Sequence, residues 1–304
     1  MPHPGSASDR DAAPARTVIA LPVYNASTEL AEALATALGQ GDDIEVHVFD
    51  NASSDDTVEV ARTFIPAERV HVGAVNVGAV ANFQRALVDT RSVRFLWLAH
   101  DDRLSPGFVA AGERALDASP DASAAIPTVN FVDGEGTILL HRPPRPGLDS
   151  RFPYRRLLAF ADQLGWMEIY GVHRRDRLMA ALPMKDVYGF DVLLTWRLLL
   201  HGRFCLAPDA VLSYRIHQGK TVDSSTEESA APGTRQEMTR PFMGIWARLW
   251  LISGEPAVPR TTRWAARLVL LTLPLRHTGR THLKTDKVYA QAKKAASAAE
   301  SPGS

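Results

Sequence analysis

The segment RFLWLAHDDRLSPGF (94–108) joins a compact apolar run to two adjacent carboxylates, Asp101 and Asp102. One explanation is that acidic residues end a strand and open a helix, with Ser105 as the N-cap and Pro106 as the first helical residue. That explanation does not account for two neighbouring carboxylates, whose charges repel unless a cation lies between them. The alternative is a bound divalent metal, and hard oxygen ligands favour Mg²⁺ or Mn²⁺.

Polar residues suited to ligand binding also follow three earlier apolar runs. The motif PVYN ends a predicted strand over 17–23, Asp50 ends a second over 43–50, and NVG (76–78) follows a third over 69–74. In open parallel sheets, ligands bind at the carboxyl ends of the strands. A solvated sheet edge would also be polar, but it would not predict so many Asp and Asn residues. We therefore expect a binding site at this edge.

Alternating strands and helices must position these groups. Helices are predicted after the strands because apolar residues recur there at helical spacing, and Ser or Asp residues precede several of them. Strands that alternate with helices of this length imply crossover connections. The sequence therefore predicts an α/β fold with a mostly parallel central sheet flanked by helices. Its further strands cover 93–99 and 122–129, and its helices cover 27–38, 54–65, 78–90 and 105–119.

The second half of the chain combines a hairpin with longer helices. DGEG (133–136) predicts a tight turn between two antiparallel strands. An amphipathic helix is expected over 189–202, where Gly202 would close it. The other expected elements are a helix over 152–164, a strand over 165–174 and one or two strands over 203–217.

Composition restricts the class of protein. The chain has 304 residues, a formal net charge of zero and one cysteine, Cys205. We expect no nucleic-acid partner, because there is no overall basic footprint, and no disulfide or cysteine-based metal site. The first sixteen residues lack the apolar core of a secretory signal, and no run of eighteen apolar residues predicts a transmembrane helix. These features predict a cytoplasmic protein.

The standard phosphate-binding loops are missing. Asp50 at the end of the second strand would suit a dinucleotide-binding protein, but that fold needs glycines in the first strand-to-helix turn. The turn here is PVYNAST, which contains no glycine, and there is no GxxxxGK[ST] motif. A bound diphosphate would therefore need another source of positive charge, and a cation held by Asp101 and Asp102 would supply it.

Six motifs occur together, in order: LPVYN, DNASSDDT, NVGAVANFQRAL, LWLAHDDRLSPG, YGFDVLLTWRLLLHGRF and LSYRIHQGKT. With these motifs the chain resembles family 2 glycosyltransferases of the GT-A fold over residues 17–221. The resemblance implies transfer of a sugar from a nucleotide-sugar donor, with inversion at the anomeric carbon and assistance from Mg²⁺ or Mn²⁺. It implies a catalytic domain over 17–223, between a disordered tail (1–16) and a flexible segment with a helical, basic C-terminal region (224–304).

The resemblance assigns donor contacts mainly to the loops after the first three strands. Tyr24 would stack on the base or ribose, or alternatively line the sheet edge. Asp50 would hydrogen-bond the base, and Asn51 replaces an aspartate often seen next to it, which weakens an assignment of the base as uracil. Asn82 would line the nucleotide or instead bond a nearby loop. The expected donor-binding residues are Pro22, Tyr24, Asn25, Asp50, Asn76, Gly78, Asn82 and Arg215.

The HDD segment matches the metal-binding DxD region of the family. Asp101 aligns with the second aspartate, whereas Ala99 stands at the first position, where it cannot bind ribose or metal. Asp102 would be a second ligand or an orienting group, and His217 matches a histidine that completes the metal site in several relatives. The resemblance therefore implies a Mg²⁺ or Mn²⁺ site formed by Asp101, Asp102 and His217, with the metal bridging the donor phosphates.

Asp191, in YGFDVLL, matches the catalytic base of the family. A carboxylate within hydrogen-bond reach of an acceptor hydroxyl removes its proton as the new C–O bond forms. The alternative is a carboxylate placed at a helix N-terminus because the helix dipole favours it there. The family often has Glu directly before this aspartate, and here the residue is Phe190.

The C-terminal region combines Trp246, Trp250 and Trp264 with many Arg and Lys residues. Its helices could lie on an anionic membrane, as a peripheral contact at the inner face that would suit a lipid-linked acceptor. Alternatively, and in our preferred interpretation, they pack on the catalytic domain.

Three classes of function follow from these residues. The first is an inverting glycosyltransferase, for example in cell-envelope polysaccharide or glycolipid synthesis, with a saccharide or lipid-linked acceptor. The second is a non-catalytic nucleotide-sugar-binding module, which the missing aspartate at Ala99 allows. The third is a nucleotidyltransferase, which needs a basic, glycine-rich phosphate loop that the sequence lacks. The presence of both Asp101 and Asp191 favours the first class.

Overall fold

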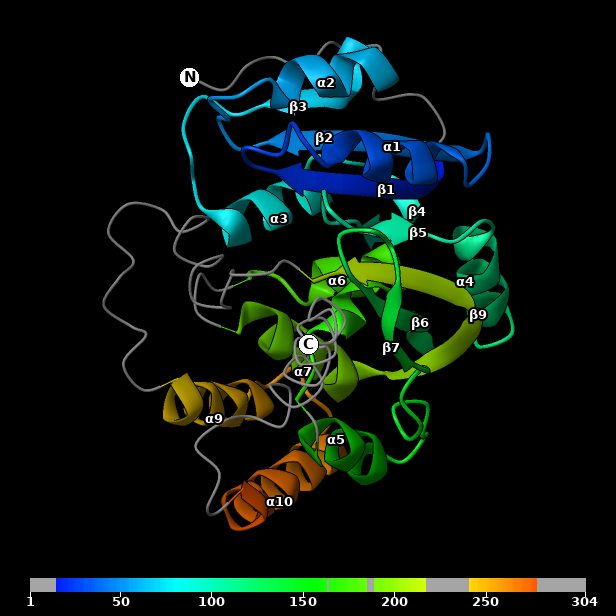
Figure 1. The fold of residues 1–304 in the computed structure, drawn as a ribbon. Helices are drawn as coiled ribbons and strands as arrows, with labels where there is room; N and C mark the ends of the chain where they lie inside the picture. The colour runs from blue at the N-terminus through cyan, green and yellow to red at the C-terminus, as the bar shows by residue number, and fades with distance from the viewer. Residues whose placement is uncertain (1–14, 163, 185–188, 217–240, 278–304) are drawn as a thin grey trace, which may run out of the picture.

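The computed structural model describes residues 15–162, 164–184, 189–216 and 241–277 of the chain. Within these ranges, nine strands form one sheet in the order β3-β2-β1-β4-β8-β6-β9-β5, with β7 paired to β6 (Figure 1). The strands are β1 (Ala15–Val23), β2 (Ile44–Asp50), β3 (Val70–Val72), β4 (Ser92–Trp97), β5 (Arg103–Leu104), β6 (Ala122–Val132), β7 (Ile138–Arg142), β8 (Val172–Arg174) and β9 (Arg203–Arg215).

The long ladders of this sheet are parallel. β1 pairs in parallel with β2 and with β4, β2 with β3, and β6 with β9. The antiparallel pairs are β4–β8, β6–β8, β5–β9 and β6–β7, and each is shorter than the β1–β2, β1–β4 and β6–β9 ladders. The predicted mostly parallel α/β fold is therefore confirmed. Because β3, β2, β1 and β4 are neighbours, their carboxyl ends meet at one edge of the sheet.

Helices cover both faces of the sheet, so β1 is buried on both sides. A strand in this position needs apolar residues on both faces, which explains the continuous apolar run in its sequence. Ile19 and Leu21 pack in a cluster with α1, α2 and α4, whereas Val18 and Ala20 pack on the opposite face with α3, α5, α6 and α7. The helices are α1 (Leu30–Leu38), α2 (Thr57–Phe64), α3 (Ala79–Val88), α4 (Phe108–Asp117), α5 (Pro153–Asp162), α6 (Arg175–Ala180) and α7 (Phe190–His201), with 3₁₀ turns η2 (Ala67–Arg69) and η3 (Met167–Tyr170).

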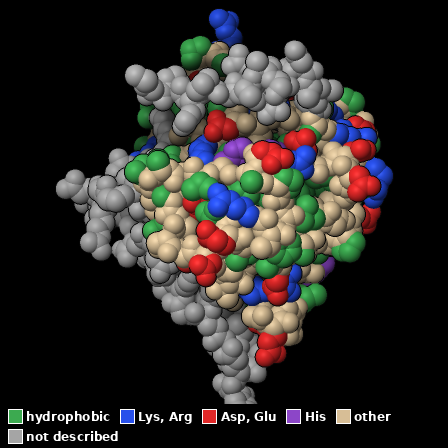
Figure 2. Space-filling view, turned by 90° about the horizontal axis from the view of Figure 1, so that it is seen from above, with side chains coloured by type: hydrophobic (Ala, Val, Ile, Leu, Met, Phe, Trp, Pro, Cys, Tyr) green, Lys and Arg blue, Asp and Glu red, His purple; other side chains and the backbone are tan. Residues whose placement is uncertain are grey.

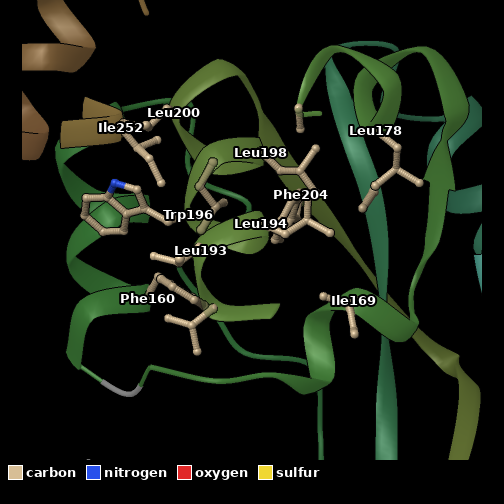
Figure 3. Close-up of a cluster of buried hydrophobic side chains, with 14 of the residues drawn as sticks. Phe160, Ile169, Leu178, Leu193, Leu194, Trp196, Leu198, Leu200, Phe204 and Ile252 are labelled. Carbon is tan, nitrogen blue, oxygen red and sulfur yellow. The ribbon is translucent and has the colours of Figure 1, made fainter. Parts of the chain in front are cut away.

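α7 is the most deeply buried helix near the candidate site. Its leucines and Trp196 lie among side chains from α5, β9 and α9 (Figure 3). Trp196 is completely buried, and its Nε1–H donates to Ser253 Oγ at 3.0 Å. An indole buried in this way adds apolar contact area and still satisfies its polar group. The position of α7 is therefore closely defined by its packing.

The C-terminal helices α9 (Pro241–Ser253) and α10 (Arg260–His277) complete this core. Ile245 and Leu249 of α9 and Val269 of α10 belong to the same buried cluster as α5 and α7. The Trp246 Nε1–H donates to the Leu270 carbonyl at 3.0 Å, which fastens α9 to α10. The interpretation that these helices pack on the rest of the fold is therefore confirmed for α9 and α10.

Three local predictions differ from the structure. β1 begins at Ala15, so the expected N-terminal tail is two residues too long. The strand expected over 165–174 is the 3₁₀ turn η3 followed by the short strand β8, because Glu168 turns inward to Arg145 and Arg142.

The predicted start of the fourth helix is also wrong. α4 begins at Phe108, and its N-cap is Gly107 with φ +72°, a left-handed conformation that favours glycine. The Ser105 hydroxyl oxygen instead accepts the Val211 N–H at 3.1 Å. Ser105 therefore holds the loop before α4 against β9 and does not cap a helix.

Charges of both signs are mixed on the surface above α2 and β3. Acidic and basic side chains lie next to one another there (Figure 2), in keeping with equal numbers of 34 acidic and 34 basic residues in the sequence. In the described part of the chain, no helix is long and apolar enough to cross a membrane. The segment expected to be flexible after residue 222 lies outside the described residues.

Candidate active site

Asn25 joins the loop after β1 to the loop after β2. Its φ is +48°, in the left-handed region that Asn tolerates better than most residues. Its main-chain N–H donates to Ser53 Oγ at 2.9 Å, and its Oδ1 accepts the Ser54 N–H at 2.9 Å. Tyr24, just before it, is partly buried at the end of the strand, and Pro22 is buried within β1. These predicted donor-binding residues thus lie together.

Asn51 joins the loops after β2 and β3. Its Nδ2 donates to Asn76 Oδ1 at 2.8 Å, and its own Oδ1 accepts the Val77 N–H at 3.0 Å. Asn76 Oδ1 also accepts the Gly78 N–H at 2.8 Å, where Gly78 has φ +87° and forms the N-cap of α3. The sequence motif predicted Asn76 and Gly78, and the structure adds Asn51 as the residue that positions them.

Asp50 and Asn82 lie at the carboxyl end of β2. The Asp50 side chain is buried, and both of its oxygens accept the Ser53 N–H, at 3.3 and 3.2 Å. Asn82 Nδ2 donates to the Phe49 carbonyl at 2.7 Å, which is the loop-bonding role considered as the alternative. The buried Oδ1 of Asn82 has no hydrogen-bond partner among the described residues. This oxygen remains able to accept a hydrogen bond.

Asp101 and Asp102 follow β4, as predicted. Asp102 is completely buried, and its Oδ1 accepts the Arg215 N–H at 3.1 Å. Burial and the neighbouring charge of Asp101 raise the pKa of Asp102 well above its ordinary value. Asp102 Oδ2 is buried and accepts no hydrogen bond from the described residues. A buried carboxylate oxygen without a donor, beside a second carboxylate, fits a divalent cation that binds hard oxygen ligands.

The expected third ligand, His217, lies outside the described residues. Among the residues that are described, no three His, Cys, Asp or Glu side chains form a group suited to hold a metal. Arg215, expected at the diphosphate, places its guanidinium against Glu32 of α1 at 2.6 Å, and Arg103 pairs with the same carboxylate. The side chain of Arg215 is thus held at α1, whereas its main chain supports Asp102.

Asp191 lies in the first turn of α7. The helix is capped by Gly189, with φ +76°, and Asp191 Oδ1 accepts the Val192 N–H at 2.7 Å. Burial raises the pKa of Asp191 to about 6, and the charge of Glu168 adds to the effect. The pKa of this carboxyl therefore lies near neutral pH, where a general base is effective.

Tyr170 connects the two acidic groups. Burial raises the pKa of its hydroxyl well above the ordinary value, and the charges of Asp102, Asp101 and Asp191 raise it further. Carboxylates from the loop after β4 and from α7 thus act electrostatically on the same tyrosine. Sequence reasoning missed Tyr170 because the segment around it was interpreted as a strand, and no motif identified this residue.

Glu168, two residues before Tyr170, is a second buried group that the sequence did not indicate. Burial alone would raise its pKa, but the charges of Arg145 and Arg142 lower it below the ordinary value. Arg142 Nη2 lies 3.0 Å from Glu168 Oε1, and Arg145 pairs with the same carboxylate. These three residues line a small cavity beside β6. They hold η3, and therefore Tyr170, in place.

Comparison with known structures gives the same fold. Residues 1–349 of S. aureus TarS in complex with UDP-GlcNAc match with a TM-score of 0.61 and 19% identity, over 92% of this chain and 79% of that chain. The mannosyltransferase PcManGT from Pyrobaculum calidifontis, in complex with GDP-Man and Mn²⁺, matches with a TM-score of 0.51 and 18% identity, over 97% of this chain and 79% of that one.

In another S. aureus TarS structure, with a TM-score of 0.57 and 16% identity, the match spans 91% of this chain but only 48% of the TarS chain. No curated protein sequence is significantly similar to the chain. The sequence model of glycosyl transferase family 2 matches residues 18–173, about half of the chain. That range runs from β1 to β8 and includes the loops after β1, β2 and β3, Asp101, Asp102 and Tyr170. The chain therefore belongs to glycosyl transferase family 2 and has the GT-A fold.

Proposed function

We propose that the protein transfers a sugar from a nucleotide-diphosphate sugar to an acceptor hydroxyl, with inversion at the anomeric carbon. The observation that carries this proposal is that the charges of Asp102, Asp101 and Asp191 all raise the pKa of the Tyr170 hydroxyl. Inverting transfer needs a group that supports the leaving diphosphate and a base for the attacking hydroxyl, both close to one sugar. We assign the first role to the carboxylates after β4 and the second to the carboxylate of α7, all of which act on Tyr170.

Asp191 is the proposed base. An acceptor hydroxyl is a weak nucleophile, and its proton must leave as the new C–O bond forms. With a pKa of about 6, Asp191 is mostly ionised at neutral pH and still accepts a proton readily. The Val192 N–H fixes one carboxylate oxygen at 2.7 Å, which leaves the other to face the acceptor. Reaction on the face opposite the leaving group would invert the anomeric centre.

Asp101 and Asp102 are the proposed protein ligands of Mg²⁺ or Mn²⁺, with His217 as a third. Such a cation acts as a Lewis acid on the leaving nucleoside diphosphate. Asp102 also accepts the Arg215 N–H, so it fixes the end of β9 against the metal-binding loop. The PcManGT structure contains Mn²⁺ with its nucleotide sugar, which supports a divalent ion in this fold.

The donor nucleotide is proposed to lie across the loops after β1, β2 and β3. Tyr24 would stack on the base or ribose, and Asp50 would accept a hydrogen bond from the base. Asn76, Gly78 and the free Oδ1 of Asn82 would line the nucleotide. UDP-GlcNAc in TarS and GDP-Man in PcManGT support a nucleotide sugar as the ligand class. The acceptor is proposed to be a saccharide or lipid-linked hydroxyl in cell-envelope polysaccharide or glycolipid synthesis.

The experiment is a thermal-stability screen of UDP- and GDP-sugars with and without Mn²⁺. A donor at about 100 times its Kd should stabilise the folded protein by about 2.7 kcal/mol. We expect one nucleotide class to raise the Tm, and only when the metal is present. Asp101→Ala should abolish the metal-dependent rise in Tm, and the Tm of this variant without metal or nucleotide shows that its fold is retained.

Asp176→Ala is the matched control, because Asp176 is an exposed carboxylate in the first turn of α6, which follows β8 at the end of the sheet where β4 begins. It should leave the nucleotide effect unchanged. Metal-dependent stabilisation that survives in Asp101→Ala would reject the proposed metal site. Stabilisation without transfer to any acceptor would favour the alternative of a non-catalytic binding module.

A further inference from the structure

One face of α10 is both exposed and apolar. Trp264, Leu268 and Leu271 follow the spacing of a single helical face, and they are 73%, 53% and 59% exposed. The opposite face, which includes Ala266 and Val269, is buried in the core. A continuous row of exposed apolar side chains marks an interaction site, whereas scattered ones do not. We call Trp264, Leu268 and Leu271 the α10 outer face.

The charges on this helix are all of one sign. Arg260, Arg263 and Arg267 lie along one flank of the α10 outer face, and α10 contains no Asp or Glu. The acid nearest in sequence, Glu255, pairs with Arg197 of α7. An apolar row bordered by arginines is typical of helices that lie on anionic membranes. The mixed charges above α2 and β3 contrast with this arrangement (Figure 2).

Charge also decides between the occupants of this face. A second copy of the chain, related by a two-fold axis, would bring the same patch against itself and place arginine near arginine. Residues 278–304 of this chain carry five Lys or Arg against two Asp or Glu, so they have the same sign as the helix. An anionic phospholipid surface has the opposite sign and also accepts apolar side chains.

We propose that the α10 outer face binds the surface of an anionic phospholipid bilayer. Trp264, Leu268 and Leu271 enter the headgroup region, and Arg260 and Arg263 contact lipid phosphates. The Arg267 guanidinium instead lies over the Trp250 ring of α9, 5.6 Å from its centroid. Trp246 and Trp250 take no direct part, because they stack on each other at 5.7 Å and contribute to the packing of α9. The membrane contact expected from all three tryptophans is thus narrowed to one tryptophan and one helix face.

α9 connects this face to the candidate active site. The Trp246 side chain bonds the Leu270 carbonyl of α10. At the other end, a Cβ on Gly189, the N-cap of α7, would lie 2.9 Å from Ile245 Cδ1. α10, α9 and the start of α7 therefore form one packed unit that ends two residues before Asp191. For a sugar transferase, membrane binding favours an acceptor carried on a lipid, an inference that rests on the proposed function.

The test is co-sedimentation of the full chain with vesicles. Wild-type protein should bind vesicles of equal parts phosphatidylglycerol and phosphatidylcholine, and should not bind phosphatidylcholine alone. The double variant Trp264→Ser/Leu268→Ser should bind vesicles at least about tenfold more weakly, because it lacks most of the apolar area that the α10 outer face would bury in the membrane. Arg260→Gln and Arg263→Gln should each weaken binding about fivefold, and 0.5 M salt should weaken it further.

The matched control is Val93→Ser/Ile138→Ser, which changes two apolar side chains that are each 56% exposed on β4 and β7. It should bind like the wild type. Equal binding by the Trp264→Ser/Leu268→Ser variant would overturn the proposal. So would a wild-type dimer that ignores vesicles and dissociates in that variant, since the face would then join two copies. Sedimentation requires no sugar transfer, so a failure here leaves the proposed function intact.

Discussion

Replacing Asp191 with asparagine should make the protein more stable at neutral pH and far less active. Burial raises the pKa of Asp191 to about 6, compared with about 3.9 in an unfolded chain. Because the folded state holds this proton more tightly, the free energy of unfolding falls as the pH rises from about 4 to about 6. Above pH 6 both states are ionised and the full cost remains. Two pH units correspond to about 3 kcal/mol, an upper value for a partly exposed side chain.

Asparagine carries no charge, so the Asp191→Asn variant does not lose stability through ionisation of a buried carboxyl. The asparagine side-chain oxygen can still accept the Val192 N–H. We expect the free energy of unfolding at pH 7.5 to rise by about 1–3 kcal/mol, with little change at pH 4. Urea unfolding at both pH values measures the difference. Turnover should fall by about 10²-fold or more. Donor affinity should not change, because the proposed partner of Asp191 is the acceptor hydroxyl.

Asp176→Asn is the control for both measurements. Asp176 occupies the first turn of α6, and its Oδ1 accepts the next N–H, of Arg177, at 2.9 Å, but its side chain is exposed. Its replacement should alter neither stability nor turnover. A gain in stability from Asp191→Asn that is equal at pH 4 and pH 7.5 would refute the argument from burial. Loss of donor affinity in that variant would place Asp191 in the donor site instead.

Two further predictions concern the donor loops and the sheet. Asn51→Ala removes the hydrogen bonds that hold Asn76, and should weaken nucleotide binding by about tenfold, since losing a bonded partner costs about 1–3 kcal/mol; unchanged affinity by calorimetry would contradict the positioning role. Gly112→Ala would place a Cβ 2.5 Å from Val172 Cγ2, and overpacking of this kind should lower the free energy of unfolding by about 1–3 kcal/mol. A urea midpoint equal to the wild type would show that β8 moves aside without cost.

The order of strands and helices follows from the sequence for a simple physical reason. β1 and β4 are buried on both faces of the sheet and contain continuous apolar runs, whereas β2 alternates apolar with polar residues along most of its length. Amphipathic helices follow β1 and β2 directly, and α4 follows β4 after the short strand β5. The polar groups predicted at the ends of these strands also lie where expected, because a parallel sheet leaves them no other edge. The family motifs then located Asp101, Asp102 and Asp191 in the chain.

The partners of individual polar residues do not follow from the sequence. Serine is a residue type preferred at helix N-caps, yet the Ser105 hydroxyl oxygen accepts a hydrogen bond from the Val211 N–H on β9. Arg215 has the charge to bind a diphosphate, yet it pairs with Glu32, 183 residues away in the chain. The charges of Asp101, Asp102 and Asp191 act on Tyr170 because η3 packs against both β4 and α7. Each of these contacts depends on tertiary packing, which local patterns do not encode.

The shared core of α5, α7, α9 and α10 determines how this protein can be recombined with its relatives. A chimera that takes only α9 and α10 from a homologue would place that homologue's side chains against Trp196 and Phe160. These two residues pack on each other and on the native α9 and α10, so the new side chains would not fit the same space. A shortened gene product ending near residue 223 would expose the same indole to water. Exchange of this part of the fold between homologues therefore requires the four helices to be transferred as one block, together with the Asp191 that α7 carries.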